Sequence, residues 1–131
     1  MDLIEAYNKA KISAFSYYNQ KPYSDEIEHF SRILETDILG YPKNEMNSGG
    51  YVIDTLEASL WCLLKNDSYK DTVLSAVNLG SDTDTTAAVA GGLAGIYYGF
   101  ENIPVDWVNQ IARKDEIIAL ANNFYNFINR K

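Results

Sequence analysis

Apolar residues recur every three or four positions along most of this chain, which is the spacing that places them on one face of an α-helix. The pattern predicts helices over residues 2–19, 25–38, 51–64, 68–77, 84–98 and 115–128, and a short one around Trp107. No stretch alternates apolar and polar residues convincingly enough to predict a strand. The sequence therefore predicts an all-α fold, a compact bundle of about seven helices.

Residues that cap or break helices separate these segments. Pro22 stops the first helix, and Asp25 can cap the second. Ser68 opens a later helix, and Gly80 closes it. The longest expected loop is GYPKNEMNSGG at 40–50, which is rich in Gly and Asn.

Small residues dominate the predicted helix at 84–98. Gly91, Gly95 and Gly99 recur at every fourth position, although a glycine inside a helix costs about 1 kcal/mol relative to alanine. Such a cost indicates that another segment passes close to this face. We therefore expect this helix to run through the middle of the bundle.

Composition limits the number of domains, the cellular compartment and the class of partner that we expect. The 131 residues fit a single domain over 1–131. The lone Cys62, expected in the core, cannot form an internal disulfide, and no signal-peptide pattern opens the sequence, so we expect a cytoplasmic protein. The longest uncharged stretch, 85–100, is shorter than the ~20 residues of a membrane span. The net charge of −7 argues against nucleic acid or an anionic membrane as a partner, although it suits a basic protein or simple solubility.

The densest polar cluster is SDTDTT at 81–86, directly before the small-residue helix. Ser81 or Asp82 can cap this helix, with Asp84 in its first turn, where negative charge complements the helix dipole. One cap residue is sufficient for that, however, and two carboxylates this close repel each other unless a cation lies between them. Oxygen ligands of this kind favour Mg²⁺ or Ca²⁺ over zinc. Both interpretations stay open at this point.

The spacing excludes one familiar calcium site. Counted from Asp82, an EF-hand loop requires glycine at its sixth position and glutamate at its twelfth. The chain has Ala87 and Leu93 there. A cation at this turn would therefore be held by a different arrangement of ligands.

Three stretches together resemble a known family: GGYVIDTLEASLW at 49–61, AVNLGSDTDTTAAVAGGLAGIYYG at 76–99 and IPVDW at 103–107. They look like the C-terminal part of the ADP-ribosylglycohydrolases, and the resemblance covers about residues 48–125. Residues 1–47 are then a divergent, helical N-terminal part of the same domain. The resemblance implies an all-α fold with two Mg²⁺ or Mn²⁺ ions in a cleft that receives ADP-ribose.

By matching position, Asp82, Asp84 and Thr85 would be metal ligands. The N-terminal part of such proteins carries a Gly-Asp motif and a Thr-Asp-Asp cluster that complete the metal site, whereas residues 1–47 contain neither a Gly-Asp nor an Asp-Asp pair. The resemblance therefore implies one wall of a two-metal site, weak or absent Mg²⁺ binding, and no catalytic residue assigned to this chain.

A second group of residues matches a loop that borders the cleft. The backbone N–H groups of Gly49 and Gly50 and the ring of Tyr51 can face an ADP-ribose-type ligand, and a plain loop at a helix start fits the same residues. Asp54 and Glu57 follow close behind as conceivable replacement acids. We expect them instead to lie in a solvated first turn of the helix.

Two functions of different classes fit these residues. The first is a truncated ADP-ribosylglycohydrolase-like protein that is not catalytic alone and acts as a protein-interaction or inhibitor module with a partial Mg²⁺ site. The alternative is a metal-dependent ADP-ribosyl hydrolase that is completed by a second chain or by self-association. In both cases we expect an exposed apolar helix face that binds a protein partner or a second copy.

Overall fold

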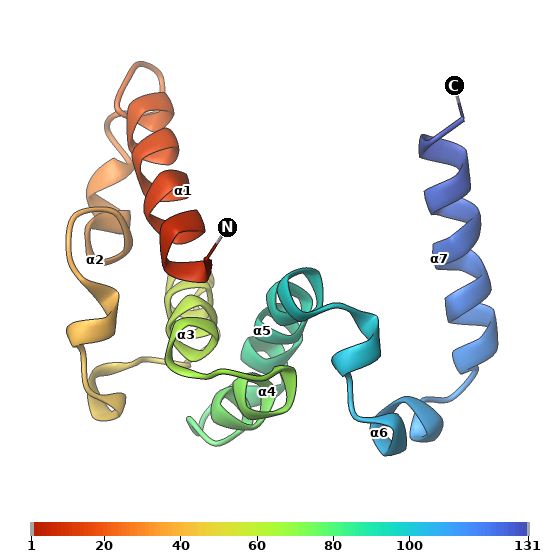
Figure 1. The fold of residues 1–131 in the computed structure, drawn as a ribbon. Helices are drawn as coiled ribbons and strands as arrows, with labels where there is room; N and C mark the ends of the chain where they lie inside the picture. Colours follow the sequence, from red (N-terminus) through yellow and green to blue (C-terminus); the bar gives the residue numbers. More distant parts are fainter. Residues whose placement is uncertain (1, 131) are drawn as a thin grey trace.

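The computed structural model describes residues 2–130, and this part of the chain is helical without a strand. Seven α-helices follow one another in Figure 1: α1 (Leu3–Tyr18), α2 (Ser31–Leu34), α3 (Val52–Lys65), α4 (Tyr69–Val77), α5 (Thr83–Tyr98), α6 (Val105–Gln110) and α7 (Lys114–Ile128). Four short 3₁₀ turns lie between them: η1 (Ile27–Phe30), η2 (Ile38–Gly40), η3 (Lys43–Glu45) and η4 (Phe100–Asn102). The predicted all-α fold with seven helices is confirmed.

Helix starts follow the local sequence signals closely. The Asp2 carboxylate accepts a hydrogen bond from the backbone N–H of Leu3 at 2.8 Å, at the first turn of α1. Ser68 caps α4 as predicted, because its Oγ accepts from the backbone N–H of Asp71 at 3.0 Å. Caps of this kind satisfy donors that have no partner inside the helix.

The helix predicted over 25–38 is wrong in its length. Only η1, the single turn of α2 and η2 form there. The side chains of Thr36 and Asp37 compete with the helical hydrogen bonds: Thr36 Oγ1 donates to the Arg32 carbonyl at 2.7 Å, and the Asp37 carboxylate accepts from the Leu39 N–H at 3.1 Å. Such local bonds stabilise a turn in place of a continuous helix.

The small-residue helix α5 packs against both α3 and α4, which places it in the middle of the core. A Cβ on Gly91 would lie 3.4 Å from the Tyr69 hydroxyl and 3.5 Å from a Val73 methyl, and a Cβ on Gly95 would lie 3.9 Å from the Tyr69 ring. The predicted close approach is thus seen at these two glycines, with α4 as the neighbour. Gly99 differs, because it ends α5 with a φ of 87°.

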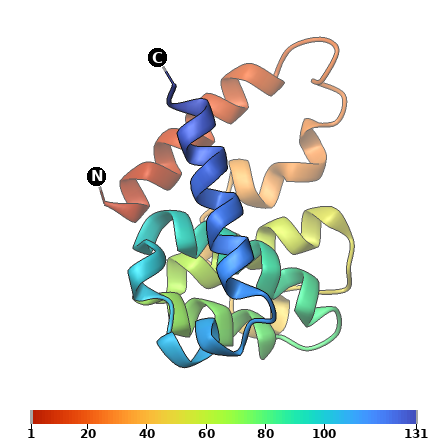
Figure 2. The ribbon, with the colours of Figure 1, turned by 90° about the vertical axis from the view of Figure 1, so that its right-hand side faces the viewer.

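Helix α7 stands apart from the other helices in Figure 1, and Figure 2 views the molecule from the side of α7, which lies in front of the bundle. None of its residues is buried, and the side chains of Leu120, Phe124 and Phe127 are 70%, 64% and 70% exposed. The most closely packed helices are α3, α4 and α5. None of the helices described is long and apolar enough to cross a lipid bilayer.

Candidate functional site

The polar turn that joins α4 to α5 has an unusual backbone. Helix α4 ends at Val77, before Gly80, and Gly80 lies in the linking turn with a φ of 95°. Ser81 follows with a φ of 63°, a left-handed conformation that residues other than glycine seldom adopt. These two residues reverse the chain sharply and bring Asp82 to the start of α5.

Asp82 occupies the N-cap position of α5, but its side chain caps no backbone N–H. Its Oδ1 instead accepts a hydrogen bond from Thr85 Oγ1 at 2.9 Å. Asp82 is half-buried, whereas Asp84 and Thr85 are exposed in the first turn of the helix. The expected side-chain cap is therefore not formed, and the three residues matched to metal ligands lie together at one helix end.

The glycine loop before α3 lies against this turn. The backbone N–H of Asp82 donates to the Ser48 carbonyl at 2.8 Å, and Ser48 Oγ donates to the Gly80 carbonyl at 2.6 Å. Gly50, with a φ of 82°, approaches so closely that an added Cβ would lie 2.6 Å from Asp82 Oδ2. Only glycine combines this backbone conformation with this distance. Two segments that are distant in the sequence, the loop at Ser48–Gly50 and the turn at Gly80–Asp82, thus lie in direct contact.

The remaining residues of the loop are open to solvent. Gly49 is exposed, and Tyr51 is 56% exposed at the N-cap position of α3. Gly50 therefore lies at the surface beside the Asp82 carboxylate, and Gly49 and Tyr51 are its exposed neighbours in the chain. Both interpretations of this loop, a ligand-facing edge and a plain helix start, are compatible with these positions.

The donor set suits a hard cation but is small. Asp82, Asp84 and Thr85 offer two carboxylates and a hydroxyl, which are oxygen ligands of the type that Mg²⁺ prefers. Within residues 2–130 no group of three or more His, Cys, Asp or Glu side chains is arranged to hold a metal ion. A cation at this turn would therefore take most of its ligands from water or from another polypeptide.

The prediction that Glu57 lies in a solvated first turn of the helix is wrong. Its side chain is buried on α3 and forms an ion pair with Arg32, with Oε1 2.9 Å from Nη2. Burial raises the pKa of Glu57, while the Arg32 charge acts in the opposite direction. Asp54, three residues earlier, is half-buried. The sequence held no signal for the ion pair, because Arg32 lies 25 positions away in a segment of different pattern.

Cys62 is completely buried, as expected. It belongs to the core cluster with Trp61, Ala76 and Ala90, which come from three helices that also carry the site. Burial raises the pKa of the Cys62 thiol. A neutral, enclosed thiol of this kind contributes to packing, not to chemistry at the site.

Comparison with known proteins matches the family model described as ADP-ribosylglycohydrolase to residues 2–131. The chain belongs to this family. The match includes residues 2–47.

Relatives from bacteria and from a mammal agree with this membership. The ADP-ribosylarginine hydrolase of Serratia proteamaculans (strain 568) is 42% identical over 83 residues, which are 63% of this chain and 23% of that protein. The ADP-ribosyl-[dinitrogen reductase] glycohydrolase of Rhodospirillum rubrum is 39% identical over 83 residues, 56% of this chain and 28% of that protein. An ADP-ribosylhydrolase of Mus musculus is 26% identical over 119 residues, which cover 81% of this chain and 32% of that protein. This ADP-ribosylglycohydrolase chain therefore spans less than a third of each of these relatives.

Proposed function

We propose that this chain forms one wall of a divalent-cation and ADP-ribose-type site of an ADP-ribosyl hydrolase, and that it does not hydrolyse such a ligand by itself. The observation that carries the proposal is the contact between the Gly50 loop and Asp82. It joins the residues matched to a ligand-facing loop with those matched to metal ligands. The proposed substrate class is a protein ADP-ribosylated on arginine, by analogy with the bacterial relative.

In this proposal Asp82, Asp84 and Thr85 hold Mg²⁺ or Mn²⁺ weakly. A bound ion would supply Lewis-acid polarisation of a ligand oxygen and would favour ionisation of a water molecule. The chain's own contribution is to fix the Asp82 carboxylate against Gly50, and to offer the backbone of Gly49 and the Tyr51 ring as the neighbouring edge. We assign no catalytic residue to this chain.

Helix α7 supports the part of the proposal that invokes a second polypeptide. Three large side chains on one helix face, Leu120, Phe124 and Phe127, are each about two-thirds exposed. Apolar surface of this extent usually marks a contact with another protein. We propose that a second family chain, or a second copy of this one, covers this face and supplies the remaining ligands.

The exposed face also favours one alternative function. A non-catalytic interaction or inhibitor module would use the same surface of α7 to dock on a protein, without any turnover. The two functions differ in what binding produces, because only the first yields free ADP-ribose when the second chain is added.

A thermal melt tests the metal site. Mg²⁺ should raise the melting temperature of the wild type in proportion to the logarithm of its concentration above the dissociation constant. Asp84→Ala should lose this response and should cost little stability without metal, because it removes one of two repelling carboxylates. Glu101→Ala changes an exposed acid in η4, beyond the far end of α5; it is the matched control and should keep the full response. A wild type that ignores Mg²⁺ contradicts the metal site.

A turnover assay tests the dependence on a second chain. Purified chain with ADP-ribosylated arginine peptide and Mg²⁺ should release no ADP-ribose beyond background. Multiple turnovers by the chain alone, abolished by a chelator, would show that residues 2–130 already contain a complete site. Release only after addition of a full-length family member that carries an inactivating change in its own Asp-x-Asp-Thr turn would support the completed hydrolase over the inhibitor.

A further inference from the structure

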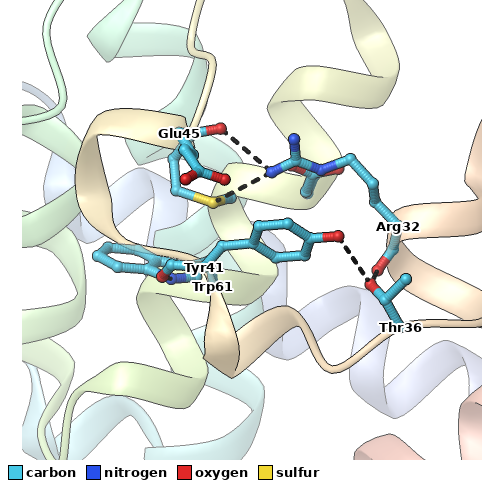
Figure 3. Close-up of polar contacts among 7 residues, drawn as sticks. Arg32, Thr36, Tyr41, Glu45 and Trp61 are labelled. Atoms are coloured by element: carbon cyan, nitrogen blue, oxygen red, sulfur yellow. Dashed lines mark hydrogen bonds and ion pairs between the residues drawn. The ribbon is translucent and has the colours of Figure 1, made fainter.

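Arg32 lies where three segments of the molecule meet: α2, the loop over residues 41–50, and α3. Figure 3 shows its guanidinium group over the ring of Tyr41, with the Arg32 Cζ 4.0 Å from the ring centroid. Nη2 donates to the Glu45 carbonyl at 3.1 Å and pairs with Glu57 Oε1 at 2.9 Å. One side chain thus contacts both the loop and α3.

The partner surfaces of Arg32 are themselves held in place. Trp61 Nε1 donates to the Tyr41 carbonyl at 3.0 Å, and the Tyr41 hydroxyl donates to Thr36 Oγ1 at 3.3 Å. Thr36 Oγ1 donates in turn to the Arg32 carbonyl (Figure 3). The start of the loop is therefore tied to α3 through Trp61 and to the backbone of Arg32 through Thr36.

The ion pair with Glu57 is enclosed rather than superficial. The Glu57 side chain is 9% exposed and that of Arg32 is 37% exposed. Arg32 Nε is buried and, among the residues described, has no hydrogen-bond partner, so the contacts of Nη2 and of the guanidinium face define its position. A planar guanidinium suits this combination of stacking and directed hydrogen bonds, which an ammonium group cannot reproduce.

The same loop continues directly to the candidate site. Met46, whose sulfur lies 3.9 Å from Arg32 Nη2, and Ser48 are both buried. Ser48 carries the hydrogen bonds to Gly80 and Asp82 described above. A short stretch of chain therefore connects the contacts of Arg32 to the contact between Gly50 and Asp82.

We propose that Arg32 is a positioning residue of the candidate site: with Glu57 as its anchor, it fixes residues 41–48 and thereby sets the distance between Gly50 and Asp82. For its ligand-binding consequence this inference rests on the proposed function. Its structural consequence, an ordered hydrogen bond from the Asp82 N–H to Ser48, does not.

The decisive variant is Arg32→Met combined with Glu57→Gln. Arg32→Met alone would leave a buried, unpaired carboxylate and could unfold the chain, whereas the double variant removes both charges together. Arg32→Lys is the conservative variant, because it keeps the charge but not the planar group. Ser68→Ala removes the cap at the far end of α4 and is the control for a general loss of stability.

Two measurements are made on each variant: the amide hydrogen-exchange rate of Asp82 by NMR, and the dissociation constant for Mg²⁺ by calorimetry. In the double variant the Asp82 amide should exchange about tenfold faster than in the wild type, while amides in the middle of α5 keep their rates. In Arg32→Lys the Asp82 amide should exchange at a rate between those of the wild type and the double variant. Ser68→Ala should leave the Asp82 exchange rate unchanged. The dissociation constant for Mg²⁺ should rise about threefold to tenfold in the double variant only.

The two measurements separate the two proposals. Faster exchange at Asp82 with weaker Mg²⁺ binding supports both. Faster exchange in a protein whose wild type does not bind Mg²⁺ supports the positioning role and overturns the metal site. An unchanged Asp82 rate in the double variant overturns the positioning role, as does an equal acceleration in Ser68→Ala, because Arg32 would then contribute only to overall stability.

Discussion

Helices α5 and α7 are almost equal in length, 16 and 15 residues, but they differ in what covers them. Helix α5 packs against α3 and α4 through Thr86, Ala90 and Ala94, which are completely buried. Helix α7 carries much larger apolar side chains at regular helical spacing, and it buries none of them. The helix with the smaller side chains is the one that the core encloses.

This difference shows that close packing depends on shape as well as on hydrophobicity. Glycine and alanine on α5 let its backbone approach the Tyr69 ring and Val73 of α4, so that many weak contacts form at once. The apolar face of α7 is suited to burial, but no other helix of the described residues covers it. Its exposure is the reason for expecting a partner outside the described chain.

Filling the contact between α5 and α4 should have the largest effect on stability. Gly91→Leu places a branched side chain where a single Cβ already touches Tyr69 and Val73, so we expect a loss of about 1–3 kcal/mol in the free energy of unfolding. Gly95→Leu should lose less, because its nearest neighbour is 3.9 Å away. A circular-dichroism melt measures both.

Gly92 provides the matched control for this prediction. It is exposed on the same helix, and an added Cβ would meet nothing within 4 Å. Gly92→Ala should therefore stabilise the chain by about 0.5–1 kcal/mol through helix propensity alone. If Gly91→Leu also left the free energy of unfolding unchanged or raised it, the inference that α5 packs closely on α4 would be wrong.

Removing the hydrogen bond between α3 and α5 should have the second-largest effect on the free energy of unfolding. Ser59 Oγ donates to the Thr86 carbonyl at 3.1 Å, and both residues are fully buried. Ser59→Ala removes the donor and should cost about 1 kcal/mol in urea unfolding, without changing the slope of the transition. Ser16→Ala, on the exposed surface of α1, should change stability by less than about 0.5 kcal/mol.

Labelling of the Cys62 thiol measures how often the same core opens, and it needs no substitution in the core. Because burial raises the pKa of this thiol and the side chain is inaccessible, a thiol reagent at about pH 8 should label the native protein far more slowly than the urea-unfolded chain. Labelling should become faster in Gly91→Leu, which loosens the core. Equal labelling rates for native and unfolded protein would show that the core around Cys62 opens freely.

Substitutions on α7 should have the smallest effect on the isolated chain. Phe124→Ser and Leu120→Ser remove side chains that are already solvated, so the free energy of unfolding should change by less than about 0.5 kcal/mol. The same variants should abolish association with a second copy or a partner, measured by light scattering at high protein concentration. A loss of several kcal/mol in the monomer would mean that α7 packs against the bundle in solution.

Much of the fold could be predicted because helices depend on neighbours three or four residues apart. The bounds of α1, α3 and α7 agree with the periodicity to within about one residue, and the cap at Ser68 was expected from its position. The failure over 25–38 has a local cause of another kind, because the Thr36 and Asp37 side chains bond to the backbone and end the helix.

The candidate site divides in the same way. Asp82, Asp84 and Thr85 were identifiable as candidates because they lie within four residues of one turn, and Gly49 and Gly50 because they are adjacent in one loop. Nothing in the sequence showed that the two segments touch, or that Asp82 leaves the backbone uncapped and bonds to Thr85 instead. The burial of Glu57 against Arg32 was equally invisible.

The sequence by itself thus determined most of the helical segments and where most of them begin, and it named Asp82, Asp84 and Thr85 as candidate cation ligands. The tertiary structure alone decided that Gly50 lies against Asp82, that Arg32 joins the N-terminal segment to the loop before α3, and that α7 is left uncovered. The physical reason is range. Helix formation is set by hydrogen bonds and side-chain contacts within about four residues, whereas contacts between distant segments depend on the path of the whole chain and on which surfaces can approach each other closely.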